Sequence, residues 1–235
     1  MMQPEYTIFP LGDAALTIDF GNRIENDNNR KVLQLFKRLQ HLSPFIRDTI
    51  PAYSSIAVYY DVMALHTKER TAYEVVKEMV EPLINESREA GISGRKIRIP
   101  VCYAAPYAPD LKELAQQKNL SVDEVIELHT ARTYRVYMIG FLPGFPYMGK
   151  VNERIAMPRK SQPRTAVPAG AVGIAGEQTG VYPLTSPGGW NIIGQTPLRL
   201  FDAAKEDAVL LQPGDEVSFY TITEDEFTNY QGGHT

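Results

Sequence analysis

Apolar side chains recur with a helical period in two stretches of the first ninety residues. The segment 26–42 predicts a helix, and its apolar face consists of Val32, Leu33, Leu35, Phe36 and Leu39. A second helix is expected to start near Thr67 and to run toward Ala90, with Gly91 as its stop. Pro82 falls inside this helix and should kink or break it.

Alternation of polar and apolar residues predicts strands in the same part of the chain. The segment 13–21 and the segment 95–103 each fit one strand, and residues 46–61 fit two short strands around Pro51. Strands interrupted by two helices predict a small α+β domain of ferredoxin-like type over residues 1–92. We see no catalytic pattern in this half and interpret it as a folding or docking module.

Two short helices are predicted between the halves, within residues 105–134. Asp110 follows a proline and is placed to cap the first helix, and Asn119 is its expected stop. Ser121 and Glu124 have the spacing of a capping box for the second helix.

The remainder of the chain is rich in short strand candidates separated by glycine and proline. Such close spacing predicts a barrel or sandwich over residues 93–235. The candidate strands are 133–141, 166–176, 180–185, 190–201 and 215–223.

The amino-acid composition and the net charge disfavour several kinds of partner and site. Among 235 residues, 43% are hydrophobic and the net charge is −4, which disfavours nucleic acid and anionic membranes as partners. The single cysteine, Cys102, excludes an internal disulfide and a multi-cysteine metal site. We expect no signal peptide, no membrane span and no metal site, and therefore a cytoplasmic protein.

The familiar catalytic patterns fit poorly. The glycines of segment 170–180 are not followed by the Lys and Ser/Thr of a phosphate-binding loop. Ser186 lacks the glycine-flanked elbow of a hydrolase nucleophile. His129 is the one candidate base for a serine, but its predicted place late in a helix favours a protonated imidazole that complements the helix dipole.

Three loops are better candidates for binding. Segment 140–149 (GFLPGFPYMG) and segment 185–197 (TSPGGWNIIGQTP) combine glycine, proline and aromatic residues. Segment 157–164 (MPRKSQPR) is basic, and its prolines reduce the entropy cost of fixing Arg159 and Arg164 toward an anion. The alternative is a solvated loop. Together the loops suit a cleft at the mouth of a barrel.

The segments GFLPGFPYMG, MPRKSQPRTAVPAGAVGIAGEQTGVYP and SPGGWNIIGQTPLRLF, in this order, resemble the KipI / allophanate hydrolase subunit 1 family. The resemblance implies a small α/β N-terminal domain and a cyclophilin-like β-barrel. One branch of the family acts as the B subunit of an ATP-dependent 5-oxoprolinase, with A and C subunits, and converts 5-oxoproline to glutamate. A second branch inhibits a histidine kinase, and urea carboxylase contains related domains.

The resemblance favours the enzyme subunit, inactive alone, with ATP and its Mg²⁺ bound through the complex. The kinase inhibitor and a subunit related to allophanate hydrolase or urea carboxylase stay as alternatives. No catalytic residue is assigned. Gln195 departs from the family, which often has a basic residue there. The aromatic residues form either a cleft wall, a partner seat or a plug at one end of the barrel. The candidate cleft residues are Phe141, Gly144, Phe145, Tyr147, Arg159, Arg164, Pro168, Gly170, Gln178, Thr179, Tyr182, Gly188, Gly189, Trp190 and Gln195.

Overall fold

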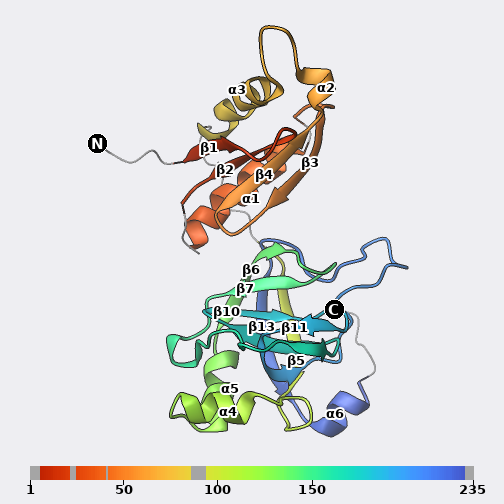
Figure 1. Cartoon of the computed structure of the whole chain (residues 1–235). Coiled ribbons are helices and arrows are strands. Elements are labelled where there is room, and N and C mark those ends of the chain that lie inside the picture. Colours follow the sequence, from red (N-terminus) through yellow and green to blue (C-terminus); the bar gives the residue numbers. More distant parts are fainter. Residues whose placement is uncertain (1–5, 22–24, 41, 86–93, 231–235) are drawn as a thin grey trace. The chain divides into compact units, whose positions relative to one another are not determined.

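The computed structural model describes residues 6–21, 25–40, 42–85 and 94–230 (Figure 1). The chain divides into two compact units, Met1–Ile92 and Ser93–Thr235.

The first unit contains an antiparallel sheet with the strand order β1-β2-β4-β3. Helix α1 (Asn26–Leu39) connects β2 to β3, while β4 lies between these two strands. This is the split β-α-β arrangement expected of a ferredoxin-like sheet. The strand predicted at 95–103 was grouped with this half, and that placement is wrong, because β5 (Lys96–Cys102) pairs with β12 and β13 in the second unit. The edge beside β2 is instead formed by β1, which was not predicted. The strands are β1 (Thr7–Pro10), β2 (Ala15–Asp19), β3 (Ile46–Pro51) and β4 (Ser55–Tyr60).

Two amphipathic helices bury their apolar faces against this sheet. Helix α1 follows the predicted pattern, and α3 (Ala72–Asn85) packs beside it. The core of the unit is Leu16, Ile18, Phe20, Val32, Leu35, Leu39, Ile56, Val58, Tyr60, Leu65, Ala72, Val76 and Val80.

The second helix differs from its prediction at its start. A short helix, α2 (Val62–Leu65), comes first, and α3 begins only after Thr71. The Thr71 backbone N–H donates to the Glu74 carboxylate at 2.8 Å, and the Glu74 N–H donates to the Thr71 hydroxyl at 3.2 Å, so this pair fixes the start. Helix α3 continues through Pro82, so of the predicted kink or break the break does not occur. Residues 86–93, which include Ala90 and Gly91, lie outside the described residues.

The second unit is a closed barrel of strands in the order β10-β7-β6-β13-β5-β12-β9. Strands β5 and β13 are parallel, and the other neighbouring pairs are antiparallel. The predicted β-rich part is thereby confirmed as a barrel. Its strands are β5 (Lys96–Cys102), β6 (Thr133–Ile139), β7 (Pro146–Gly149), β9 (Ala171–Ala175), β10 (Gln178–Val181), β12 (Asn191–Gln195) and β13 (Glu216–Ile222).

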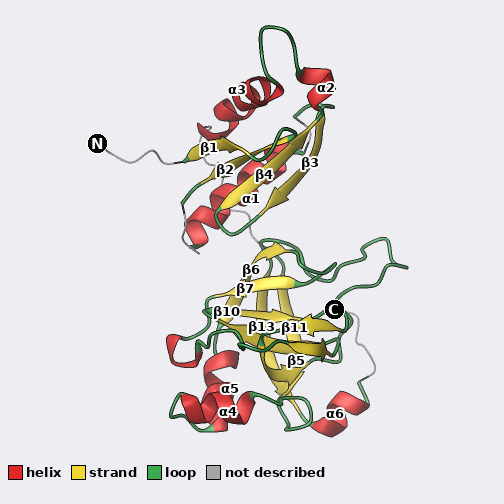
Figure 2. Cartoon of the chain, viewed as in Figure 1, coloured by secondary structure: helices red, strands yellow, loops and turns green. Residues whose placement is uncertain are grey.

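Apolar side chains fill the barrel interior. Two helices lie at one end of the barrel (Figure 2). These helices are α4 (Leu111–Gln117) and α5 (Val122–Thr130). The capping box predicted for α5 is present. The predicted stop after α4 is also confirmed, since Asn119 has a φ of 53° in the left-handed region. The strand side chains of the core are Ile99, Val101, Tyr134, Val136, Met148, Val172, Ile174, Val181, Ile193, Val217 and Phe219.

The remaining elements of the second unit are short. Strands β8 (Arg164–Val167) and β11 (Ser186–Gly188) form a separate two-stranded sheet. A 3₁₀ turn (Glu153–Ile155) follows β7, and helix α6 (Glu224–Thr228) follows the last barrel strand. Within the described residues, no helix has both the length and the apolar character needed to cross a membrane.

Candidate ligand-binding site

An aromatic cluster from the two glycine-rich loops and the end of β10 covers the outer face of the barrel. Its members are Phe141, Phe145, Tyr147, Tyr182 and Trp190. The Phe145 ring is central, with centroid distances of 4.9 Å to Tyr147, 5.1 Å to Tyr182 and 5.3 Å to Trp190. The contacts with Tyr182 and Trp190 are edge-to-face, an arrangement that is favourable at such distances.

Glycine on β10 makes room for these rings. A Cβ on Gly180 would lie 3.0 Å from the Trp190 ring and 3.1 Å from the Phe145 ring. Its neighbour Val181 belongs to the barrel interior, so Gly180 faces outward by the alternation of a strand. Gly180 is therefore required for the packing of these two rings.

Burial separates the members of the aromatic cluster. Phe145 and Tyr182 are 1% exposed and Trp190 is 4% exposed, while Tyr147 is half-buried. Phe145, Tyr182 and Trp190 form a small second core outside the barrel. These aromatic residues were predicted to plug one end of the barrel, and they pack against its outer face instead. They also present no ring surface that would anchor a partner. Only Phe141, at 63% exposure, projects from the cluster.

Phe141 is held in a strained turn. Its φ is 67°, and the N–H of Leu142 donates to the carbonyl of Gly140 at 2.8 Å, which closes a γ-turn around it. A side chain in this backbone region costs roughly 1–2 kcal/mol. Gly144, with a φ of 80°, lets the same loop turn back toward β7.

We expect Phe141→Asn to leave the free energy of unfolding within about 1 kcal/mol of the parent, because Asn tolerates the left-handed region. The relief of strain offsets the lost edge contact with Phe145, whose ring centroid lies 5.8 Å away. Urea denaturation measures this balance. A loss above about 2 kcal/mol, the scale of removing a buried ring contact, would show that the Phe141 ring supports the core.

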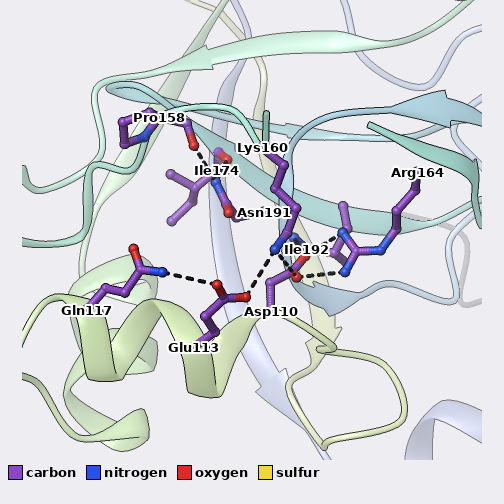
Figure 3. Close-up of polar contacts among 9 residues, drawn as sticks. All are labelled: Asp110, Glu113, Gln117, Pro158, Lys160, Arg164, Ile174, Asn191 and Ile192. Carbon is purple, nitrogen blue, oxygen red and sulfur yellow. Dashed lines mark hydrogen bonds and ion pairs between the residues drawn. The ribbon is translucent and has the colours of Figure 1, made fainter. Parts of the chain in front are cut away.

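Two cations of the basic loop 157–164, Lys160 and Arg164, bind the carboxylate of Asp110 (Figure 3). The Arg164 guanidinium donates to both carboxylate oxygens of Asp110, at 2.8 and 2.6 Å. Lys160 lies 2.8 Å from the same carboxylate and 3.1 Å from Glu113. The backbone N–H of Ile192 also donates to Asp110, at 2.6 Å.

This network explains two differences from prediction. Asp110 makes no side-chain cap bond to α4, because its oxygens are taken by the basic loop and by β12. Burial alone would raise the pKa of Asp110, but the bonds from Arg164, Lys160 and the Ile192 N–H outweigh it and lower the pKa. Arg164 was predicted to contact a ligand, and it is instead committed to Asp110.

Arg159 is the exposed cation of this loop. Its guanidinium carbon lies 6.0 Å from the centre of the Trp190 ring. Burial raises the pKa of Tyr147, and the positive charge of Arg159 acts in the opposite direction. Across the described ranges, no carboxylate forms an ion pair with Arg159, so its charge is available to a ligand.

His129 and Thr179 lie in the barrel interior. The imidazole is fully buried between the Tyr103 hydroxyl, 2.8 Å from Nδ1, and the Thr179 hydroxyl, 3.0 Å from Nε2. Burial lowers the pKa of His129 to about 3, so the predicted protonated imidazole is wrong although its place late in α5 is right. Thr179 was predicted to line the cleft, and it packs inside the barrel instead.

The other predicted residues divide between two cavities. Gly170 and Gln195 line one of about 650 Å³, where the Gln195 amide donates to the Ala169 carbonyl at 2.7 Å. Arg159 lines another, of about 660 Å³. The structure thus separates residues that were predicted to share one cleft.

The remaining candidates have simpler positions. Pro168 is exposed and Gln178 is half-exposed on β10. A Cβ on Gly188 would lie 2.3 Å from the Tyr182 hydroxyl, and one on Gly189 would lie 3.6 Å from the carbonyl oxygen of Lys160. Gly188 is therefore needed for packing against Tyr182, while Gly189 meets only ordinary contacts.

Two polar residues near the site were not predicted to contact a ligand. Asp110 organises the basic loop, and its partners are too distant in the sequence to be recognised there. Asn191 lies in the Arg159 cavity beside Trp190 and is 4% exposed. The one feature of the sequence that could have indicated Asn191 is that it is a polar residue at the start of an otherwise apolar strand, β12. In the part of the chain that the structure describes, no group of His, Cys, Asp or Glu is arranged to hold a metal ion.

A family model described as "Carboxyltransferase domain, subdomain C and D" matches residues 6–211. The chain belongs to this family. Among relatives of this carboxyltransferase-domain chain, the 5-oxoprolinase B subunit of Bacillus subtilis (strain 168) is 42% identical over 236 residues, covering 98% of each chain. The 5-oxoprolinase B subunit of Escherichia coli O157:H7 is 39% identical over 209 residues, covering 89% of this chain and 93% of the relative.

Solved structures share the fold of this carboxyltransferase-domain chain. The crystal structure of TTHA0988 has a TM-score of 0.77 and 37% identity, and the match covers 88% of this chain and 40% of that one. The crystal structure of the Kluyveromyces lactis urea amidolyase has a TM-score of 0.74 at 17% identity, over 96% of this chain and 16% of that one. The resemblance drawn from the three loops is confirmed at the level of the family.

Proposed function

We propose that this protein is the B subunit of an ATP-dependent 5-oxoprolinase, which acts with A and C subunits to convert 5-oxoproline to glutamate. The observation that carries the proposal is 42% identity to the B subunit of a 5-oxoprolinase over 98% of both chains. The proposal includes a cytoplasmic location, a cyclophilin-like barrel and two domains, residues 1–92 and 93–235.

The site chemistry supports a binding and positioning role. Arg159 offers a planar cation to a carboxylate, and 5-oxoproline carries one. His129 is neutral and enclosed, so it offers no base to a substrate outside the barrel. The residues of this chain therefore bind and orient, and the phosphoryl-transfer step depends on charge stabilisation supplied with the partner chains.

Mg²⁺–ATP does not fit the described residues. The glycine-rich segment forms strands β9 and β10 with no Lys and Ser/Thr after its glycines, and the described carboxylates form no metal cluster. ATP is therefore assigned to the assembled complex, and no step of this chain is derived through it.

The test is ATP hydrolysis that depends on 5-oxoproline, with this chain alone and then mixed with A- and C-type subunits. We expect turnover only in the mixture. Arg159→Ala is expected to lower kcat/KM about tenfold, because one charged hydrogen-bonding partner of the carboxylate is lost. Arg154→Ala is the matched control, since Arg154 is exposed and pairs with Glu124 at 3.4 Å away from the aromatic cluster.

No turnover in a mixture of folded subunits would overturn the 5-oxoprolinase assignment. Urea as the substrate and a purified histidine kinase as the binding partner are the next two assays. A kinase-docking surface anchored on Phe145, Tyr147 and Trp190 is disfavoured because the Phe145 and Trp190 rings are buried and Tyr147 is half-buried.

A further inference from the structure

The Arg159 cavity is an open pocket of about 660 Å³ in the second unit. Its walls come from α4, the loop 157–162 and the first residue of β12. This volume lies within the range of small-molecule sites, roughly 300–1,000 Å³. The polar groups on its walls therefore define which small molecule it accepts.

Asn191 supplies a fixed hydrogen-bond acceptor to this cavity. Its side-chain nitrogen donates to the carbonyl oxygens of Pro158, at 2.8 Å, and Ile174, at 3.2 Å (Figure 3). Both amide hydrogens are thus committed, and a flipped amide would place its oxygen against two carbonyls. Oδ1 accepts no hydrogen bond from any described residue and is the group left to face the cavity.

The cationic groups of the cavity are only partly neutralised. Lys160 and Glu113 pair with each other at 3.1 Å, so they largely cancel. Arg159 and Lys118 line the same cavity, and neither forms an ion pair with a carboxylate of the described residues. The cavity therefore combines a positive field with one oriented acceptor.

We propose that this cavity binds a lactam that carries a carboxylate. The ring N–H donates to Asn191 Oδ1, and the carboxylate lies against Arg159 and Lys118. A phosphate fits less well, because its oxygens would face the Asn191 oxygen without a fixed donor. This inference rests on the proposed function, and it names the cavity and the groups that hold 5-oxoproline.

The first experiment measures binding of 5-oxoproline to the whole chain by calorimetry and by the side-chain amide NMR signals. Two analogues test the two contacts separately. N-methyl-5-oxoproline lacks the ring N–H that donates to Asn191, and the carboxamide of 5-oxoproline lacks the negative charge that Arg159 and Lys118 bind. We expect each to bind about tenfold more weakly, the scale of one charged or oriented hydrogen bond. Equal binding of all three compounds, or no binding of 5-oxoproline, would overturn the assignment.

Surface variants test the cations without disturbing the fold. Lys118→Ala and Arg159→Ala are expected to weaken 5-oxoproline about tenfold each but to leave carboxamide binding unchanged. Arg154→Ala should change neither. Inorganic phosphate is the competing probe, and displacement of 5-oxoproline by phosphate at equal concentration would show a general anion site and overturn the lactam assignment.

The outcome for the cavity is separable from the outcome for the proposed function. If the assembled complex hydrolyses 5-oxoproline while Lys118→Ala leaves its KM unchanged, the 5-oxoprolinase assignment stands and the cavity assignment fails. If the chain binds 5-oxoproline with the expected analogue pattern but folded subunits show no turnover, the cavity assignment stands and the enzyme assignment fails.

Discussion

Replacing Asp110 by Ala is expected to lower the free energy of unfolding of the barrel unit by about 3 kcal/mol. The change leaves Arg164 and Lys160 without their shared carboxylate and leaves the buried N–H of Ile192 without an acceptor. Removing one partner of a buried ion pair usually costs about 3–5 kcal/mol. We expect the lower value here, because the Arg164 and Lys160 side chains are 31% and 23% exposed and can be solvated by water. Urea denaturation followed by the fluorescence of the single Trp190 reports on this unit.

Asp110→Asn separates charge from hydrogen bonding. It keeps one oxygen for the Ile192 N–H and should cost less than Asp110→Ala. Asp202→Asn is the matched control, because Asp202 pairs at 3.3 Å with Arg199, which is 73% exposed, and should cost only about 0.5 kcal/mol. A loss below about 1 kcal/mol for Asp110→Ala is the size expected for solvent-exposed ion pairs, and it would contradict the prediction.

The same network defines a window of acid sensitivity. The pKa of Asp110 is lower in the folded chain than in the unfolded chain. Its contribution is therefore fully present above the unfolded value, about 3.9, and is lost as the pH falls below it through the folded value. The difference between the parent and Asp110→Asn should shrink only in this range.

The network also has a consequence for the site. Lys160 and Arg164 tie the basic loop to the start of α4, and Arg159 precedes them on the exposed side near Trp190. A cation whose backbone is fixed loses less entropy when it binds an anion. The ion pairs of Lys160 and Arg164 with Asp110 thus hold Arg159 in place for binding. Of the two alternatives for this loop, a binding loop and a solvated loop, Lys160 and Arg164 follow neither, whereas Arg159 fits the binding loop.

Local patterns of the sequence were sufficient for much of the fold. The apolar stripe of α1 and the Ser121–Glu124 capping box each depend on residues within a few positions of one another. Glycine and proline between short apolar segments likewise placed most barrel strands, although β7 was not among the candidates. Closure of the barrel was beyond such patterns, because β5 pairs with β13 from about 120 residues away. The glycine and aromatic residues indicated a barrel with loops, but they did not specify the order of its strands.

The candidate site was harder to predict for the same reason. Arg164 meets Asp110 across 54 residues, so the sequence did not reveal which arginine was free. Phe141 and Phe145 have the same side chain in the same loop, yet one is 63% exposed and the other 1%. The difference arises from the strained turn at Phe141 and from the space above Gly180. Neither feature is visible before the loop is folded against the barrel.

His129→Gln is expected to destabilise the barrel unit by about 2 kcal/mol at pH 7 and to remove its main acid sensitivity above pH 5. The Thr179 hydroxyl donates to the Gly173 carbonyl at 3.1 Å, so it accepts from the imidazole Nε2–H, and the Tyr103 hydroxyl donates to Nδ1. The imidazole also stacks on Phe219 at 4.7 Å. Gln retains only part of these contacts.

The pH dependence gives this prediction its sharpest test. The pKa of His129 falls from about 6.5 in the unfolded chain to about 3 when folded, so the contribution is full above 6.5 and is lost as the pH falls toward 3. Between pH 7 and pH 5 the parent should lose about 2 kcal/mol, at about 1.4 kcal/mol per unit below 6.5. The variant lacks this loss, so the two stabilities should converge near pH 5, above the window of Asp110. Parallel curves for parent and variant would mean that the folded barrel admits a proton at His129, which its enclosure among Tyr103, Thr179 and Phe219 argues against.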